Sequence, residues 1–443
     1  MSTERLRQPT GHHRSRAPHR SLTVICLFLG VTVLDGAITA SRAQSLRMSG
    51  LAEPQQTGQL PGQPDRALPL GDWLVYPKAT LGTMFDSNPT QSSVGAHSSF
   101  GFEIAPSLLA EHNTGINKIT LFGTADGRIY TSTTSSNADD VTAHAGALDV
   151  YSPRPDLTVR SQFDYLRQKD FLSNLSTNYG LTSLNPTGVG LAPTVNPQSY
   201  NQLAGNLSIQ KNFAEFFGVL SGSVVSQTYD RTSGTTAPSP NGIVYTGSGR
   251  LGIWATPAFY TYIQVSADSR VYSDNLLSSS GYRVLAGVGS DRIGFFRGEL
   301  YLGYQSETYN SGSIGAVSAP AFGGRIEYYP LPDLTFRATL DESLGASLLT
   351  ASGTATRVTS MLLDATYAPV QEWSVSARGG YVHTEYVDNP RRDNGWVVGF
   401  TVDYNFWRQV GLALNYQHLE TSSNVPLAGF SRDVATLGLT YRY

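Results

Sequence analysis

The sequence predicts an all-β fold, a single closed antiparallel transmembrane β-barrel of about 18 strands, with 16 as the alternative count. Three observations predict it. Long segments alternate between apolar and polar residues, short turns alternate with longer polar segments, and the last ten residues form one more alternating strand. Charged residues make up 15% of the 443 residues, against roughly 25% in soluble domains. Beyond the N-terminus, no apolar run reaches the ~18 residues that a membrane helix needs.

The N-terminal residues, 1–43, are predicted to be a cleaved secretory signal peptide. Arginines precede an apolar core at 22–34, and cleavage is expected after Ala43, with Ala40 as the alternative site. The core is too short to span a membrane. The single cysteine, Cys26, lies inside this core rather than at its end, so neither a lipoprotein site nor a disulfide is expected.

Residues 44–72 are rich in proline, glutamine and glycine, which predicts a flexible periplasmic lead-in. This segment is too short for the plug domain of an energy-coupled transporter or for a helical-repeat scaffold. The barrel itself is expected to occupy residues 73–443.

Turns recur through the barrel region at intervals of about 40 residues, the length of two strands and their turns. The short turns are expected near 113–115, 153–156, 213–215, 256–257, 292–294, 330–333, 369–371 and 407–408. The longer polar segments are 86–98, 133–140, 170–198, 232–241, 273–281, 309–317, 347–355, 388–394 and 421–428. Eight short turns and nine long segments give about 18 strands, with periplasmic turns and extracellular loops.

The last ten residues place Leu437, Leu439, Tyr441 and Tyr443 on one face of a strand. An unpaired edge strand is a liability, and closure onto the first strand removes it. The pattern of Gly438, Tyr441 and Tyr443 resembles the C-terminal assembly signal of bacterial outer-membrane barrels, so the barrel-assembly machinery is an expected partner. The alternative is the terminal strand of a soluble β-sandwich.

Aromatic residues gather near the short turns, as in the girdle that marks a membrane interface. The alternative explanation is the ordinary preference of aromatics for strands. The predicted girdle consists of Trp73, Phe213, Phe216, Phe217, Trp254, Phe259, Tyr260, Phe295, Tyr328, Tyr367, Trp373, Phe406 and Trp407.

The polar face of the strands carries charges throughout. A charge facing lipid at mid-depth costs about 2–4 kcal/mol, so these residues are expected to face the lumen. The candidate pore-lining residues are Arg128, Arg160, Asp164, Arg250, Asp268, Arg270, Arg297, Glu299, Arg325, Glu327, Arg337, Asp341, Arg378 and Asp403. Asp126, Arg283, Asp291, Arg357 and Asp364 are expected on the same face. Ten arginines against nine acids predict salt bridges, little net field and weak ion selectivity; the alternative is that the charges are purely structural.

The longest loop, 170–198, is the third on its side, and by analogy with general porins it is the candidate constriction. It has no charge between Phe171 and Tyr200. Its candidate residues Asn174, Asn178, Tyr179 and Asn185 would suit neutral, hydroxyl-rich solutes. The alternative is a mobile extracellular loop.

No enzyme is expected. His383 and His418 lie near Asp388 and Glu420, but in no recognisable catalytic motif. No spacing of ligands suggests a metal, and no glycine-rich phosphate loop appears, so no cofactor is expected.

Two motifs carry a family resemblance: Phe85-Asp86-Ser87-Asn88 at the end of the first strand, and Pro155-Asp156-Leu157-Thr158-Val159-Arg160, closely repeated at Pro332-Asp333-Leu334-Thr335-Phe336-Arg337. With them, residues 73–443 resemble the putative beta-barrel porin 2 family. The resemblance implies a pore in a Gram-negative outer membrane, in contact with the lipid bilayer and lipopolysaccharide.

The function expected from these features is passive, weakly selective diffusion of small hydrophilic solutes. The alternatives are an accessory barrel for exopolysaccharide export and a structural barrel with an occluded lumen. The net charge of −3 gives no reason to expect nucleic acid. An oligomer is compatible with the sequence, although no residue marks a contact between copies.

Overall fold

The structure, a computed structural model, describes most of the chain beyond its N-terminal 66 residues. The described residues are 67–132, 139–170, 189–190, 198–230, 241–273, 275, 278–310, 312, 315–347, 354–370, 372–387, 389–426 and 428–443. The predicted signal peptide and most of the predicted lead-in therefore lie outside them. No helix in the described part of the chain is long and apolar enough to cross a membrane.

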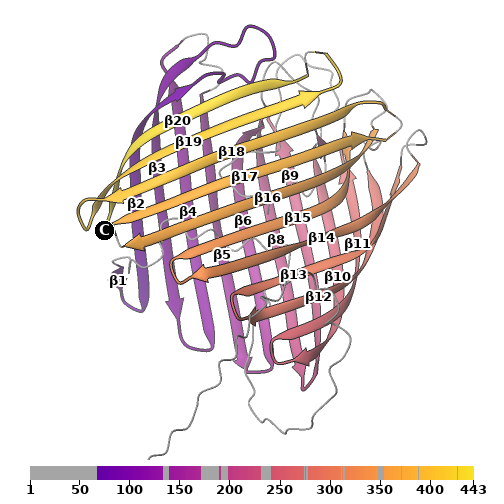
Figure 1. Cartoon of the computed structure of the whole chain (residues 1–443). Coiled ribbons are helices and arrows are strands. Elements are labelled where there is room, and N and C mark those ends of the chain that lie inside the picture. The colour runs from indigo at the N-terminus through magenta and orange to yellow at the C-terminus, as the bar shows by residue number, and fades with distance from the viewer. Residues whose placement is uncertain are drawn as a thin grey trace, which may run out of the picture. The chain divides into compact units, whose positions relative to one another are not determined.

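Eighteen long strands form one closed antiparallel barrel (Figure 1). They are β2 (Trp73–Asp86), β3 (Ser99–Asn113), β4 (Asn117–Tyr130), β5 (Asp140–Arg154), β6 (Leu157–Asp170), β8 (Gln198–Phe213), β9 (Phe216–Tyr229), β10 (Gly242–Thr256), β11 (Phe259–Tyr272), β12 (Ser279–Ile293), β13 (Phe296–Tyr309), β14 (Ala316–Leu331), β15 (Leu334–Ser347), β16 (Thr354–Val370), β17 (Trp373–Tyr386), β18 (Arg392–Asn405), β19 (Val410–Ser423) and β20 (Phe430–Arg442). The predicted fold is confirmed, with 18 rather than 16 strands.

The barrel closes where its last strand meets its first. β20 pairs with β2 from Lys78 opposite Arg442 to Asp86 opposite Val434. A short strand, β1 (Leu68–Leu70), pairs with the same edge of β2 nearer its N-terminal end, at Trp73–Val75. β1 lies within the segment predicted to be a lead-in. The edge of β2 is therefore occupied on both sides of Pro77, whose carbonyl accepts the Tyr443 amide at 3.3 Å.

The outer face of the wall is apolar, as the alternating pattern requires. In β20, Leu437, Leu439 and Tyr441 are exposed, while the intervening Gly438 and Thr440 are buried. The strands beside them repeat this arrangement, so an apolar band surrounds the barrel.

Three residues predicted for the aromatic girdle point inward instead. Phe217, Trp254 and Tyr260 share the inner face of β9, β10 and β11, where they pack together with Tyr262. Their girdle assignment was wrong because closeness to a turn does not specify a face, whereas position along the strand does. Trp73, Phe213, Phe216 and Trp373 follow the alternation on the outer face.

The repeated Pro-Asp-Leu-Thr unit forms the same turn twice. The Asp156 carbonyl accepts the Asn212 amide at 2.8 Å, and the Asp333 carbonyl accepts the Ala368 amide at 2.9 Å. Each turn thereby extends the ladder to the following strand. Lys211 donates a hydrogen bond to the Asp156 carboxylate, which holds the pKa of that exposed group below its usual value.

Candidate functional site

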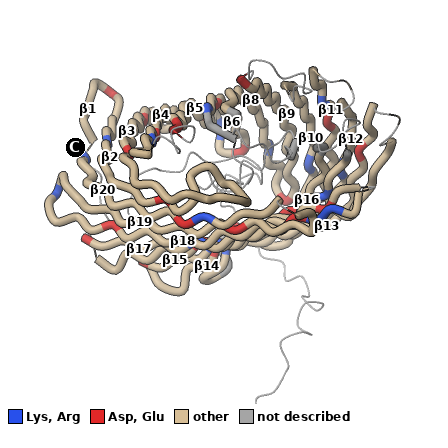
Figure 2. Tube along the Cα trace, turned by 90° about the horizontal axis from the view of Figure 1, so that it is seen from above, with Lys and Arg blue, Asp and Glu red and all other residues tan. Residues whose placement is uncertain are grey.

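The candidate site is the inner face of the barrel wall, and all fourteen candidate pore-lining residues lie on it. Arg250 shows the geometry: it is 3% exposed, while its neighbour Leu251, on the opposite face, is 75% exposed. The same parity places the other thirteen residues opposite the exposed apolar side chains of their strands. Seen from above, charges of both signs occur around the wall (Figure 2).

The wider set of inward charges contains one error. Arg357 lies four residues before the exposed Met361 on β16, so the two share the outer face. There Arg357 makes ion pairs with Glu342 and Glu385. The pairing of residues 354–359 with residues 342–347 of β15 places Arg357 beside Glu342, and position along β16, rather than charge, decides its face. Without Arg357, nine arginines remain against nine acids.

Inward charges are organised as ion pairs. Some pairs join residues two apart on one strand, as the sequence predicted: Arg128–Asp126 at 2.9 Å, Arg270–Asp268 at 2.9 Å and Arg325–Glu327 at 2.6 Å. Others join neighbouring strands or strands further apart: Arg378–Asp364 at 2.7 Å, Arg283–Asp341 and Arg337–Glu327 at 3.2 Å, Arg297–Asp291 at 3.5 Å and Arg442–Asp403 at 3.8 Å. Asp164 contacts His144 and accepts a hydrogen bond from Gln162. Within this set the inward charges are paired and balanced in number.

The tightest group of inward residues surrounds Glu299 on β13. Its carboxylate accepts two hydrogen bonds from Arg250, at 2.9 and 3.2 Å, and one each from Tyr260 and Tyr262, at 3.0 and 2.7 Å. The Arg250 guanidinium also lies 3.9 Å from the Tyr262 ring centroid. All four residues are buried, so the cluster stabilises one side of the wall and is closed to solutes.

Two glycines on the adjacent strand β12 leave space for the tyrosine rings of this cluster. A Cβ at Gly289 would lie 2.2 Å from Cζ of Tyr260, and one at Gly287 would lie 2.3 Å from Cζ of Tyr262. Both distances are far below any tolerated contact, so each ring rests directly on the backbone of β12.

The Gly289→Ala variant is therefore expected to destabilise the barrel by about 1–3 kcal/mol, because the Tyr260 ring must leave its place. Urea unfolding in detergent micelles measures the change. Gly249→Ala is the matched control, since a Cβ there meets nothing within 4 Å. Equal stability of the two variants would contradict the packing role of Gly289.

A second buried cluster joins the first and last strands at the loop end of the barrel. Asp86 is 0% exposed and accepts hydrogen bonds from Arg432, at 2.5 to 3.1 Å, and from the Tyr130 hydroxyl at 2.7 Å. The Ser87 amide and hydroxyl bond to the backbone of Asp433. The Asn88 amide group donates to the carbonyl of Ser431.

Sequence reasoning used the Phe85-Asp86-Ser87-Asn88 motif only as a mark of family resemblance. Its structural role is to join the first barrel strand, β2, to the last, β20, through hydrogen bonds and an ion pair. The signal that could have found this role was a charged residue, Asp86, at an inward position of the first strand together with Arg432 at an inward position of the last. Gly438, part of the predicted assembly signal, faces the same junction, where a Cβ would lie 2.8 Å from Thr80 Cγ2.

The wall also contains a seam between β14 and β15. The two strands pair only between Gly323 opposite Asp341 and the short turn, although β14 extends to Ala316 and β15 to Ser347. The Tyr309 amide donates to the Gly315 carbonyl, so odd-numbered residues of β14 direct their backbone groups toward β13. Residue 320 is even-numbered, and its backbone groups therefore point away from β13, toward the seam. That residue is Pro320, which has no amide hydrogen to leave unsatisfied there.

Side chains from the inner face of β11–β13 take the place of the missing ladder. Gln305 Nε2 donates to the Pro320 carbonyl at 3.1 Å and to the Glu342 carbonyl at 3.3 Å, bridging the seam. Arg283 also donates to Glu342 O, and Arg270 donates to Leu344 O at 3.0 Å. Because these donors lie on the inner face of β11, β12 and β13, residues 342–345 of β15 lie against that face at the loop end of the barrel.

One described part of the predicted constriction loop, residues 189–190, lies at the same place. Its candidate residues Asn174, Asn178, Tyr179 and Asn185 lie outside the described residues. Within this loop the short strand β7 (Val189–Gly190) pairs in parallel with residues 346–347 of β15. β7 lies between β6 and β8 in the sequence, whereas β15 lies on the other side of the barrel (Figure 1), so the pairing places residues 189–190 beside β15.

The two histidines considered for catalysis lie on the outer face. His383 Nδ1 is 2.7 Å from Asn394 Oδ1, and His418 Nδ1 is 2.8 Å from Asp433 Oδ1. Each imidazole is thus engaged with a neighbouring strand. Among the described residues, no group of three or more His, Cys, Asp or Glu side chains could hold a metal ion.

Comparison with known proteins identifies the family. The family model described as putative beta-barrel porin 2 matches residues 66–443. Among curated protein sequences, none matches the chain. Among solved structures, the chain is similar to the copper transporter OprC, with 11% identity, 86% of this chain and 82% of that chain covered, and a TM-score of 0.44.

Two porin-sized structures are similar over nearly their whole length. OccAB4 from Acinetobacter baumannii has 10% identity, with 83% of this chain and 98% of that chain covered and a TM-score of 0.41. An anion-selective porin from Comamonas acidovorans has 11% identity, with 84% and 99% covered and a TM-score of 0.36. Fold, closure and family model agree: the chain is an outer-membrane β-barrel and belongs to the putative beta-barrel porin 2 family.

Proposed function

We propose that this protein is a passive, weakly selective diffusion pore for small hydrophilic solutes in a Gram-negative outer membrane. The observation that carries the proposal is the inner face of the closed barrel, where charged residues are numerous and balanced in ion pairs. Such a face requires water, because charges without hydration or partners are costly in a barrel interior. Balanced pairs leave little net field, which accounts for weak ion selectivity. No catalytic step is part of the proposal.

Two elements set the width of the proposed pore. One is the inward-turned part of β15, residues 342–347, held by Arg270, Arg283 and Gln305. The other is the third long loop, whose β7 strand pairs with it. The competing function is a structural barrel in which these two elements occlude the lumen completely.

Deleting residues 172–197 is expected to raise the single-channel conductance, because the deletion removes β7, which pairs with the inward-turned part of β15. Asp170 and Gln198 are opposite each other in register, so an Asn-Gly turn that also replaces Phe171 can join β6 to β8 without strain. The measurement is the current through predicted mature protein, residues 44–443, in a planar bilayer. Deletion of 232–239, between β9 and β10, is the matched control and should leave conductance unchanged.

The outcomes separate the hypotheses. A steady conductance that rises only with the 172–197 deletion supports an open pore narrowed by that loop. Absence of conductance in every form would refute the diffusion pore and favour the occluded barrel. Accessory export of exopolysaccharide predicts that loss of the protein traps polymer in the periplasm, and normal secretion would contradict it.

A further inference from the structure

Part of the inner wall differs from the paired charges around it. Across β6, β8, β9 and β10, the residues Gln162, Asn206, Ser223 and Thr246 stand directly opposite one another in register. One step nearer the short turns, Ser208, Ser221, Ser248 and Ser266 form a second row that extends to β11. We call these eight residues the neutral panel.

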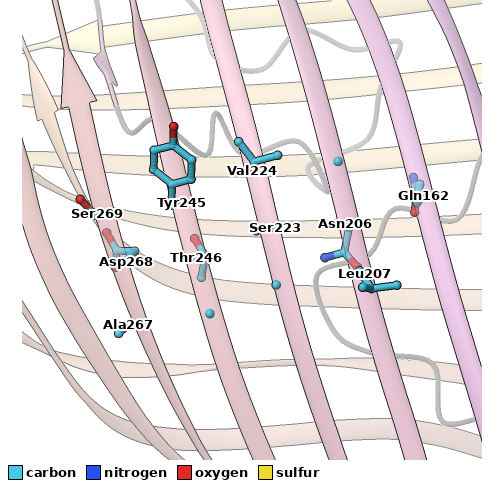
Figure 3. A pocket seen from close by; sticks show the side chains of 13 residues that line it. Gln162, Asn206, Leu207, Ser223, Val224, Tyr245, Thr246, Ala267, Asp268 and Ser269 are labelled. Atoms are coloured by element: carbon cyan, nitrogen blue, oxygen red, sulfur yellow. The ribbon is translucent and has the colours of Figure 1, made fainter.

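The panel faces the interior. In each strand its members alternate with exposed apolar residues of the outer face, such as Leu220, Val224 and Tyr245. Figure 3 shows Gln162, Asn206, Ser223, Thr246 and Asp268 following one another across five strands.

Charged residues border the panel rather than interrupt it. Arg160 and Asp164 flank it on β6, and Asp268 and Arg270 flank it on β11. These flanking residues have ionic or hydrogen-bonding partners of their own. The panel therefore presents hydroxyl and amide groups in a local field that is close to neutral.

Gln162 and Ser208 are buried, and Gln162 donates a hydrogen bond to Asp164. The other members of the panel make few hydrogen bonds to one another. Ser221 and Ser248 bond to each other, with their hydroxyl oxygens 2.6 Å apart. Among the described residues, Asn206 Oδ1 has no hydrogen-bond partner. Ser221, Ser223, Thr246 and Ser248 are only half-buried, so water or a solute can reach them. In contrast with the ion pairs elsewhere, these groups keep hydrogen-bonding capacity for a ligand.

A similar row crosses the opposite side of the barrel, from β15 to β20. Its members, in register from strand to strand, are Thr335, Thr366, Ser376, Thr401, Asn415 and Thr436. Asn415 Nδ2 donates to the Thr401 hydroxyl at 2.9 Å, and Asn415 is exposed on the inner face. Figure 1 shows the two sets of strands on opposite sides of the barrel.

We propose that the neutral panel and the β15–β20 row form a binding track for neutral, hydroxyl-rich carbohydrate. Hydroxyl and amide side chains can each donate and accept, which matches the repeated hydroxyls of a sugar. An ion gains little from them, because they offer no net charge. The inference rests on the proposed pore, since a solute must enter the lumen to meet the track.

The test measures sugar-induced interruption of the current through single channels of predicted mature protein in a planar bilayer. Maltohexaose is expected to interrupt the current more strongly than hexagalacturonate, an acidic chain of the same length. In Ser221→Ala/Ser248→Ala, the apparent affinity for maltohexaose should fall at least roughly fivefold, since each neutral hydrogen bond contributes modestly. The double change removes both partners of one hydrogen bond and so leaves neither hydroxyl orphaned.

Asn415→Ala/Thr401→Val tests the opposite row in the same way. Ser269→Ala is the matched control, because Ser269 faces outward on β11 and should leave the affinity unchanged. Salt conductance of each variant shows that it has folded and inserted.

The possible results are distinct. Conductance without interruption by maltohexaose, or interruption equal in all variants, overturns the carbohydrate track while leaving the pore intact. Absence of conductance overturns the pore itself, and the track with it. Glucose, maltohexaose and dextran, compared at equal mass concentration, show which form of carbohydrate binds. Interruption of the current by glucose and maltohexaose but not by dextran indicates free sugars, and interruption by dextran indicates a polymer chain. Either source supports the track.

Discussion

Replacing Asp86 with alanine is expected to destabilise the barrel by about 3–5 kcal/mol, because the buried Arg432 guanidinium loses its carboxylate. Arg432 is only 7% exposed, and it reaches Asp86 across 346 residues of sequence. The same carboxylate accepts hydrogen bonds from the Tyr130 hydroxyl and from the backbone N–H of Asn88. The change therefore weakens the contact between β2 and β20 that closes the barrel, at the loop end where β2 ends and β20 begins.

The measurement is the free energy of unfolding in urea, with the protein in detergent micelles. Asp403→Ala is the matched control, since Asp403 pairs with Arg442 at 3.8 Å in a more exposed setting, where a lost pair costs about 1 kcal/mol or less. The double variant Asp86→Ala/Arg432→Ala should be more stable than Asp86→Ala alone, because no buried charge remains at the junction. A double variant less stable than Asp86→Ala would count against this explanation.

Removing the Glu299 carboxylate, as in Glu299→Ala, is expected to cost about 3–5 kcal/mol as well, because buried Arg250 then lacks its counter-charge. Two tyrosine hydroxyls, of Tyr260 and Tyr262, lose their acceptor in the same step. Glu299→Gln should cost less, since an amide oxygen still accepts hydrogen bonds in the same volume. The expected order of stability is therefore wild type, Glu299→Gln, Glu299→Ala.

Trp254 gives a local optical signal for this cluster. Its ring centroid lies 5.0 Å from that of Tyr260, so hydration of the cluster should shift its fluorescence to longer wavelength. The contribution of Trp254 is obtained by subtracting the spectrum of a Trp254→Phe protein. Asp291→Ala is the control, because the Asp291–Arg297 pair is partly exposed and 3.5 Å apart. A red shift equal to that of the control would refute the buried role of Glu299.

The strands and their two faces could be predicted from the sequence because both are local properties. A side chain's face follows from position along a strand, so the inward assignment of residues such as Arg250 and Asp341 needs no knowledge of distant segments. The strand count follows from turns, which proline, glycine and short polar runs mark locally. Where alternation was set aside in favour of other cues, as for Trp254 and Tyr260, the prediction was wrong.

The identity of the partners across the barrel could not be predicted in this way. The sequence contained Asp86 and Arg432, but only closure of the sheet brings these two residues into contact. The same is true of Arg250 and Glu299, which lie on strands that are not adjacent. Long-range ion pairs depend on register and curvature, which no local pattern specifies.

The sequence by itself determined that this protein is a barrel of alternating strands with an apolar outside and a charged, balanced inside. Only the tertiary structure decided that β15 separates from β14, lies against the inner face of β11–β13 and pairs with β7. The physical reason is that alternation fixes which face is polar, whereas the path of a strand depends on whether its backbone groups find partners in the ladder. Along residues 342–345, side chains of β11–β13 supply those partners instead.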